Sequence, residues 1–452
     1  MTILRDNFFW GNSTSSMQTE GAARVDGKGP SVYDVRGQTT WTDAIDEYHR
    51  YQEDIALMAN AGVNCYRFQI SWSRVCPEGD GEFNEAGIQF YSDLIDALLQ
   101  AGITPLACLY HFDMPEHLAE EYNGFIADEV VQAFIRFGKE MLNRFASRVP
   151  LWLTFNEQNH YSVPEVFNIS GYRGPKTVAA LYQIQQHVML AHAAIANEIH
   201  ANYPGLQIGG MLAYQTVYPH SPLPEDVAAA RKFGEFANFN LLSLFTKGEY
   251  SSEVLAFMHR EHLDAILDST EMAVISQCRS DFISLSYYST TTIDSTKIPV
   301  NSAPNWYLVN GKAQNPYLQE TEWAWQIDPL GFRTTLNDIY NRCRLPIFPI
   351  ENGIGVREDW DGNHPIEDDY RITYHREHLS ALKDAVEYDG VDVMGYLVWG
   401  LIDILSSKGD MTKRYGFVYV NRSNDDLRDL KRVPKKSYSW LRQTIQSNGE
   451  TL

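Results

Sequence analysis

The sequence predicts an α/β fold in which eight parallel strands, each followed by helix, close into a (β/α)8 TIM barrel. Three observations predict it: short runs rich in β-branched and aromatic residues recur, helical periodicity separates them, and two of the runs end in a glutamate. We expect one domain over residues 1–452 with extended loops, because single barrels of this kind often exceed 400 residues and no Pro/Gly/Ser-rich linker interrupts the chain.

The predicted strands are taken in chain order. Several of them are apolar almost throughout, as in residues 395–399, which is typical of strands covered on both faces. The eight runs span residues 8–14, 63–70, 104–111, 150–157, 207–214, 282–288, 346–352 and 393–400.

Helices are predicted between these runs wherever apolar residues recur three and four positions apart. Residues 53–58 show this spacing before the second strand, and residues 91–99 show it before the third. Two connections are longer than the rest. We expect extra helices in 215–281 and a long irregular loop in 289–330, where barrels of this class build specificity.

The net charge and the cysteine content limit which kinds of partner and which cellular compartment we expect. The formal net charge of -21 argues against nucleic acid and anionic membranes, because both require a basic surface. The first ten residues lack the apolar core of a signal peptide, and the five cysteines show no CxxC spacing. We therefore expect a cytoplasmic protein with reduced thiols, and we leave open whether it forms a homo-oligomer.

Two glutamates are the first candidates for chemistry. Glu157 and Glu351 each stand at the carboxyl end of a predicted strand, which is the edge where barrels of this kind carry their active sites. Glycoside hydrolysis uses a pair of carboxyl groups, and a distance of about 5–5.5 Å between them accompanies retention of configuration. From strand position alone, both could equally be ordinary loop glutamates.

The motifs around these residues decide between the two interpretations, because in combination they resemble the glycoside hydrolase family 1 enzymes, which are retaining and β-glucosidase-like. The resemblance runs from about residue 8 to residue 437. Its motifs are Phe9-Trp10-Gly11, Gln18-Thr19-Glu20-Gly21, Tyr66-Arg67-Phe68, Ser71-Trp72-Ser73-Arg74, Leu109-Tyr110-His111-Phe112-Asp113-Met114-Pro115, Thr154-Phe155-Asn156-Glu157 and Glu351-Asn352-Gly353.

The resemblance implies a role for each glutamate. Glu351 is the expected nucleophile, and Glu157 is the expected acid, which becomes the base in the second step. Arg67 and Tyr288 match the partners of the nucleophile. We expect them to keep Glu351 charged, while Glu157, facing a carboxylate in a partly dry cleft, stays protonated.

The resemblance also implies a set of sugar contacts. Gln18, His111 and Asn156 match residues that bind sugar hydroxyls, and Trp399 matches the aromatic platform under the ring. Taken without the family pattern, His111 would more often be a hydrogen-bonded core histidine and Trp399 a barrel-packing residue.

Three departures from the plain β-glucosidase pattern resemble the 6-phospho-β-glycosidase branch. Gln158-Asn159 follows Glu157 where plain β-glucosidases usually have a proline, and Ser286 stands in place of their usual asparagine before Tyr287-Tyr288. After the eighth strand, the glutamate that binds O4 and O6 of the sugar is missing. In the same stretch, Ser406, Lys413 and Tyr415 match the residues of that branch that donate hydrogen bonds to the phosphate. A solvated basic turn is the alternative interpretation.

Together these features predict a retaining 6-phospho-β-glucosidase that needs no cofactor and no metal. Its partner is a small phosphorylated β-glucoside, such as cellobiose 6-phosphate or an aryl β-glucoside 6-phosphate. Ser407 stands where 6-phospho-β-galactosidases have tryptophan, which favours the glucosidase, but a galactosidase or a dual enzyme stays open. From other classes, we keep an inactive barrel that binds glycans or proteins, and we set aside an isomerase or aldolase because no lysine or metal set stands at the strand ends.

Overall fold

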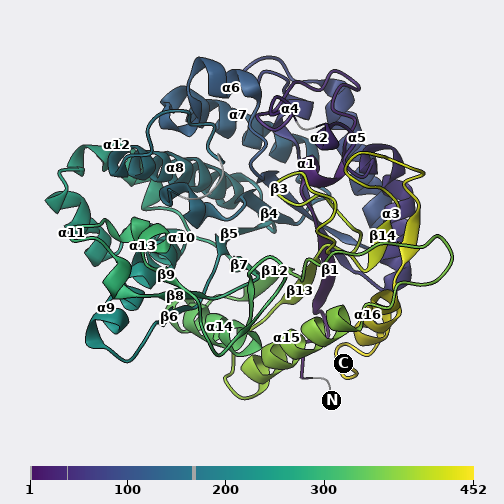
Figure 1. The fold of residues 1–452 in the computed structure, drawn as a ribbon. Coiled ribbons are helices and arrows are strands. Elements are labelled where there is room, and N and C mark those ends of the chain that lie inside the picture. The colour runs from purple at the N-terminus through teal and green to yellow at the C-terminus, as the bar shows by residue number, and fades with distance from the viewer. Residues whose placement is uncertain (1–2, 38, 165–168) are drawn as a thin grey trace.

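The computed structural model describes residues 3–37, 39–164 and 169–452, and it contains a closed barrel of eight parallel strands (Figure 1). The strand order around the barrel is β1-β13-β12-β7-β5-β4-β3-β2, and β1 pairs in parallel with both β13 and β2 to close the ring. The predicted fold class is thereby confirmed. The barrel strands are β1 (Phe9–Ser13), β2 (Cys65–Gln69), β3 (Thr104–Tyr110), β4 (Leu151–Phe155), β5 (Gln207–Ala213), β7 (Phe282–Tyr287), β12 (Ile347–Asn352) and β13 (Gly395–Trp399).

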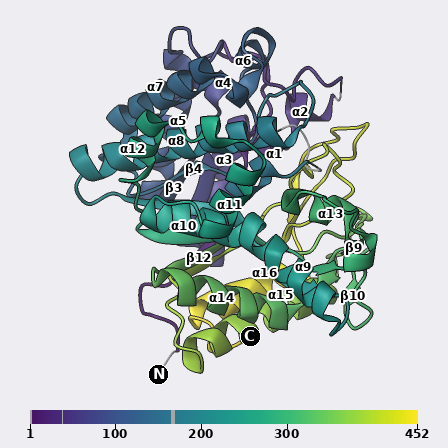
Figure 2. The same cartoon turned by 90° about the vertical axis from the view of Figure 1, so that its left-hand side faces the viewer.

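Helices surround the barrel and bury its outer face (Figures 1 and 2). On α5, the buried residues Ile88, Tyr91, Ile95 and Leu98 recur at helical spacing, so one stripe faces the strands. The longer surrounding helices are α3 (Glu47–Ala61), α5 (Glu85–Gln100), α7 (Asp128–Phe145), α8 (Val178–Asn202), α14 (Pro329–Cys343), α15 (Asp369–Glu387) and α16 (Lys436–Gln446).

The core of the barrel has two parts, and a third, small cluster of Ala230, Phe233, Ala237 and Ile293 packs α9 (Pro224–Gly234) against β8 (Thr291–Ile293). A large apolar cluster lies between the strands and the helices, and a smaller one, which includes Leu106, Leu153, Phe282 and Phe348, fills the barrel interior. Because successive residues of a strand face opposite sides, each barrel strand contributes to both parts. The interior is therefore packed, and the site lies above it at the carboxyl ends of the strands.

The two long connections differ in how well they were predicted. Residues 215–281 hold the expected extra helices, namely α9 (Pro224–Gly234), α10 (Asn240–Lys247), α11 (Ser252–Arg260) and α12 (Ser269–Ile275). Residues 289–330 are less irregular than expected, since β8 (Thr291–Ile293) lies between β6 (Val217–Pro219) and β9 (Lys312–Ala313) in a small sheet. This segment also contains α13 (Tyr307–Asn310) and the pair β10 (Gln319–Glu320) and β11 (Gln326–Ile327).

The remaining α-helices and strands are short. They are α1 (Ser16–Thr19), α2 (Thr40–Asp43), α4 (Trp72–Val75), α6 (Glu116–Glu121), β14 (Val418–Val420) and β15 (Arg432–Pro434). Among the described residues, no helix combines the length and the apolar character needed to cross a membrane.

Candidate active site

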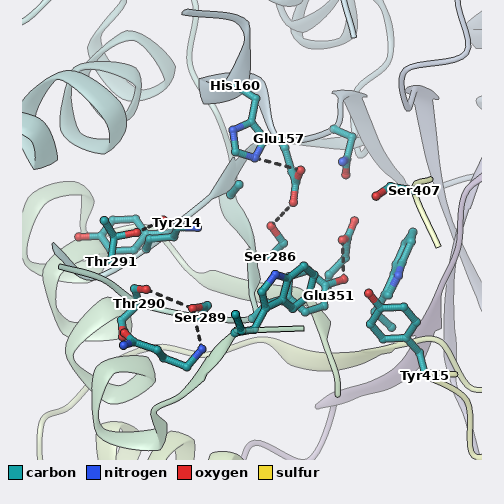
Figure 3. Close-up of a pocket in the computed structure, with 18 of the residues that line it drawn as sticks. Glu157, His160, Tyr214, Ser286, Ser289, Thr290, Thr291, Glu351, Ser407 and Tyr415 are labelled. Atoms are coloured by element: carbon teal, nitrogen blue, oxygen red, sulfur yellow. Dashed lines mark hydrogen bonds and ion pairs between the residues drawn. The ribbon is translucent and has the colours of Figure 1, made fainter. Parts of the chain in front are cut away.

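A cavity of about 440 Å³ opens at the carboxyl end of the barrel (Figure 3). Its size falls within the range of sites that enclose a small ligand. Most of the predicted site residues line it, and the remaining ones, Arg67, Ser406 and Lys413, lie behind or beside the lining. The predicted residues in the lining are Gln18, His111, Asn156, Glu157, Tyr288, Glu351, Trp399 and Tyr415.

Glu351 reaches the cavity because of an irregularity in β12. Phe348 pairs with Ser284 of β7, but Glu351 pairs with Ser286, so three residues of β12 span the distance of two on β7. A bulge of this kind adds one residue and changes which face the next side chain occupies. Strict alternation from Phe348 would have turned Glu351 away from the interior, so the bulge is what aims the carboxyl inward.

Two donors hold the Glu351 carboxyl. Arg67 Nη1 donates to Oε1 at 3.0 Å, and the Tyr288 hydroxyl donates to Oε2 at 2.9 Å. Arg67 is fully buried, and its Nη2 donates to Asn156 Oδ1 at 2.7 Å. Burial first, and then the neighbouring Glu351, raise the pKa of Tyr288 well above its ordinary value, so the phenol keeps the proton it donates.

Glu157 follows β4 in a strained backbone conformation. Its φ of 43° is left-handed, a region in which a residue with a side chain costs about 1 kcal/mol or more. It precedes the 3-10 turn Gln158–Ser162. The Ser286 hydroxyl donates to Glu157 Oε1 at 2.5 Å, and His160 Nε2 lies 3.3 Å from Oε2 (Figure 3).

The pKa shifts of the two carboxyls in this structure run against the protonation order expected from the sequence. Burial, together with the charge of Glu157, raises the pKa of Glu351 to about 8 even though Arg67 opposes the shift. Burial also acts to raise the pKa of Glu157, but contacts with His160 and Ser286 outweigh it and lower the pKa. The sequence-based expectation counted the donors to Glu351 and missed the donors to Glu157.

The predicted sugar contacts surround the two carboxyls with unused polar atoms. His111 Nδ1 and Asn156 Nδ2 are buried and lack a hydrogen-bond partner among the described residues. Burial first, and then Arg67, lower the pKa of His111 well below its ordinary value, so its ring is neutral and can both donate and accept. The ring stacks on Trp399 with centroids 5.5 Å apart. A polyhydroxylated ligand would satisfy such a set.

Gln18 is fixed by the loop that follows β13. Its Nε2 donates to the carbonyl of Leu405 at 2.6 Å, and Ser15 Oγ donates to its Oε1 at 2.6 Å. The side chain therefore joins α1, which follows β1, to the loop that carries the predicted phosphate residues.

The three predicted phosphate residues are only partly brought together. Tyr415 lines the cavity, whereas Ser406 is buried beside it with its Oγ accepting from the backbone N–H of Lys408 and of Asp410. Lys413 is also buried, and its Nζ lies 3.4 Å from the centroid of the Trp325 ring. Burial, followed by repulsion from Lys408, lowers the pKa of Lys413 to about 7.

A buried carboxylate anchors this loop. Asp403 accepts from Lys435 Nζ at 3.0 Å, from Arg414 Nη1 at 3.2 Å and from the backbone N–H of Gly416 at 2.8 Å. Arg414 also pairs with Val356 through both of its backbone groups. The segment is extended there, so Lys413 and Tyr415 share one side of it while Arg414 faces the anchor.

Sequence reasoning missed several lining residues. His160 and Trp325 carried no recognised motif, although the spacing of His160, three residues after Glu157 at a strand end, could have suggested contact. The polar wall built by β8, β9 and their neighbours also lay outside the motifs. Its members include Gln215, Thr290, Thr291, Lys312, Gln314 and Glu320.

Comparisons with known proteins agree with this geometry. The profile of Glycosyl hydrolase family 1 matches residues 1–450. The chain is 39% identical to the aryl-phospho-beta-D-glucosidase BglA of Bacillus subtilis (strain 168) and 37% identical to the phospho-cellobiase of Klebsiella oxytoca, in each case over 100% of both chains. Among solved structures, a family 1 β-glucosidase from Thermotoga maritima aligns with this chain with a TM-score of 0.87 and 28% sequence identity. The alignment covers 99% of this chain and 99% of the β-glucosidase.

Proposed function

This chain belongs to glycosyl hydrolase family 1 and is a glycoside hydrolase, and we propose that it hydrolyses 6-phospho-β-D-glucosides with retention of configuration. The observation that carries the proposal is the convergence of Glu157 and Glu351 on one cavity that Tyr415 also lines, with Lys413 next to Tyr415. Relatives named for phosphorylated β-glucosides, such as the 6-phospho-beta-glucosidase AscB of Escherichia coli (strain K12), support the substrate class.

In the first step, the Glu351 carboxylate attacks the anomeric carbon while Glu157 gives its proton to the departing oxygen. The bond to the aglycone breaks and a glycosyl ester of Glu351 forms. The two carboxyls share one proton near neutral pH, and this step requires it on Glu157. Arg67 and Tyr288 support the reactive form, because their hydrogen bonds orient an ionised Glu351.

Phosphate recognition would rest on the loop after β13. A glutamate near O6 would repel a phosphate, whereas the Lys413 ammonium and the Tyr415 hydroxyl offer donors of the right character. Ser406 precedes the cavity-lining Ser407, and its hydroxyl, which accepts from the Lys408 and Asp410 N–H groups, keeps its own hydrogen to donate to the ligand. We assign these three residues to the phosphate site on that basis.

One residue, Ser407, decides whether we assign the enzyme to glucosides or to the epimeric galactosides. Ser407 lines the cavity where 6-phospho-β-galactosidases carry tryptophan, and a small side chain leaves room for an equatorial O4 group. We therefore favour glucosides over galactosides. Comparing the two epimeric 4-nitrophenyl 6-phosphoglycosides tests this choice, and equal kcat/KM values would identify a dual enzyme.

The experiment that tests the function compares 4-nitrophenyl β-D-glucoside with the same compound carrying a 6-phosphate. We expect kcat/KM to favour the phosphorylated compound strongly. An equal or higher value for the plain glucoside would leave the barrel and the glutamates in place but would refute the phosphate assignment. Trapping of Glu351 by a 2-fluoro glucoside 6-phosphate would exclude an inactive binding barrel.

We also propose a cytoplasmic location. All five cysteines are free thiols and four of them are buried, which fits a reducing compartment. The substrates are phosphorylated sugars, which carry charge and do not cross membranes unaided.

A further inference from the structure

We propose that His160 is a positioning residue that orients the Glu157 carboxyl for its work as the base in the second half of the reaction. This inference rests on the proposed function, because it concerns the acid/base residue of that same site. None of the sequence motifs assigns a role to His160.

The local backbone places the two side chains together. Glu157 is the residue before the 3-10 turn Gln158–Ser162, and the His160 N–H donates to the Glu157 carbonyl at 3.0 Å. In a 3-10 turn, residues three apart eclipse each other. His160 Nε2 therefore comes to lie 3.3 Å from Glu157 Oε2, with both side chains lining the cavity (Figure 3).

The arrangement fixes the orientation of the Glu157 carboxyl. An ionised Glu157 only accepts, so the His160 nitrogen that faces it then carries the ring proton. The Ser286 hydroxyl takes the other oxygen at 2.5 Å, so each oxygen of Glu157 has a polar partner. A protonated Glu157 keeps the His160 contact as well, because a neutral imidazole can accept at this nitrogen and carry its proton on the other one.

Other charged and titratable groups surround the pair. From other segments around the cavity, Glu157 interacts electrostatically with Arg67, Glu351, Tyr288 and Tyr415. Arg67 is already engaged with Glu351, and burial keeps the two tyrosines neutral. Lys312 and Glu320 line the same cavity. Among the described residues, His160 is the basic side chain that contacts Glu157 directly.

The second half-reaction needs this base. The Glu157 carboxylate takes a proton from water, the water oxygen bonds to the anomeric carbon, and the ester bond to Glu351 breaks with its electron pair returning to the Glu351 carboxylate. His160 keeps the carboxylate directed into the cavity for this step. A substrate whose leaving group departs without an acid does not use Glu157 in the first step, so with such a substrate the loss of the contact is seen in the second step.

The test uses His160→Ala and His160→Gln, since glutamine keeps an N–H donor without the imidazole ring. The substrate is 2,4-dinitrophenyl β-D-glucoside 6-phosphate, whose leaving group departs without an acid. We expect kcat of His160→Ala to fall about tenfold, as for a misplaced catalytic group, while kcat/KM stays within about twofold. A burst of dinitrophenolate should precede the slow steady state, and His160→Gln should fall between the alanine variant and the wild type.

Two readouts separate this role from a merely structural one. Azide, which attacks the glycosyl ester without a base, should restore turnover of His160→Ala. With the 4-nitrophenyl substrate, the alkaline limb of kcat/KM should move to higher pH, because Glu157 keeps its proton longer. The matched control is His117→Gln, since His117 lies 3.6 Å from Asp80 on the surface and away from the cavity.

Equal losses of kcat and kcat/KM without azide rescue would overturn the proposal, as would wild-type kinetics in His160→Ala. The same burst experiment with 2,4-dinitrophenyl β-D-glucoside separates it from the proposed function. If wild-type enzyme prefers this plain substrate but the variant still shows the burst and rescue, the phosphate assignment fails and the His160 inference stands. Turnover of neither substrate would refute both.

Discussion

Replacing Lys413 with methionine tests whether a buried ammonium recognises the 6-phosphate. Lys413 is 7% exposed, and its Nζ lies over the Trp325 ring at 3.4 Å and within 5.3 Å of the Tyr415 ring. Methionine keeps much of the volume and the contact with Trp325. The substitution therefore removes the charge and the donor while leaving the wall of the cavity filled.

The expected loss follows from two opposing contributions. A buried hydrogen bond to a charged group contributes about 3 kcal/mol, and moving the ammonium off the indole face costs about 1 kcal/mol. The difference of about 2 kcal/mol corresponds to a fall of about 30-fold in kcat/KM for 4-nitrophenyl β-D-glucoside 6-phosphate. Most of it should be seen in KM, because the contact lies away from the reacting bond. The plain glucoside should change by less than about threefold.

The pH dependence of KM gives the assay a second, independent measurement. Burial lowers the pKa of Lys413 to about 7, so the ammonium is present below that pH and lost above it. KM for the phosphorylated substrate should rise as the pH passes 7, and this rise should vanish in Lys413→Met. Lys312→Met is the matched control, since Lys312 lines the same cavity from β9. Equal losses on phosphorylated and plain substrates would refute the reasoning.

Three further predictions concern the carboxyls and the scaffold. Glu351→Ala should lower kcat with 4-nitrophenyl β-D-glucoside 6-phosphate by at least about a thousandfold, and added azide should give an inverted glycosyl azide by nuclear magnetic resonance; substantial activity without azide would contradict the assignment. Ser286→Ala removes a donor to the Glu157 carboxylate, so the alkaline limb of kcat/KM should move up by less than about one pH unit, and an unchanged or lower limb would argue against that contact. Arg432→Met leaves the buried Asp54 carboxylate without its bidentate partner and should cost about 3–5 kcal/mol in denaturant unfolding; a loss under about 1 kcal/mol would mean that the scaffold absorbs the charge.

The order of strands was predictable because each barrel strand is a short apolar run bounded by polar turns. The predicted ranges and the observed strands differ by one or two residues at most ends, as between 63–70 and Cys65–Gln69. Strand ends depend on where pairing stops, which the composition of a single strand does not specify. The bulge before Glu351 was unpredictable for the same reason, since it exists only in the register between β12 and β7.

The site was predictable where a motif names the residue and unpredictable where a contact arises from folding. Glu157 and Glu351 reach one cavity as expected, but their protonation depends on Ser286, which comes from another strand, and on His160, which a local turn delivers. Likewise, the small sheet of β6, β8 and β9 joins segments far apart in the chain. No periodicity within residues 289–330 could reveal that pairing.

Buried ion pairs hold the loop after β13 in place, so only a few residues of this loop decide which substrate binds. Asp403 is buried and ties together the start of the loop, Arg414 near its end and Lys435 beyond it. Removing Asp403 would leave two buried cations without this partner, so the loop can vary at its cavity face but not at its anchor. Lys413 and Tyr415 stand on the variable face, one residue to either side of the anchored Arg414. A change of substrate in this scaffold therefore requires new side chains at those positions, and the barrel beneath them need not move.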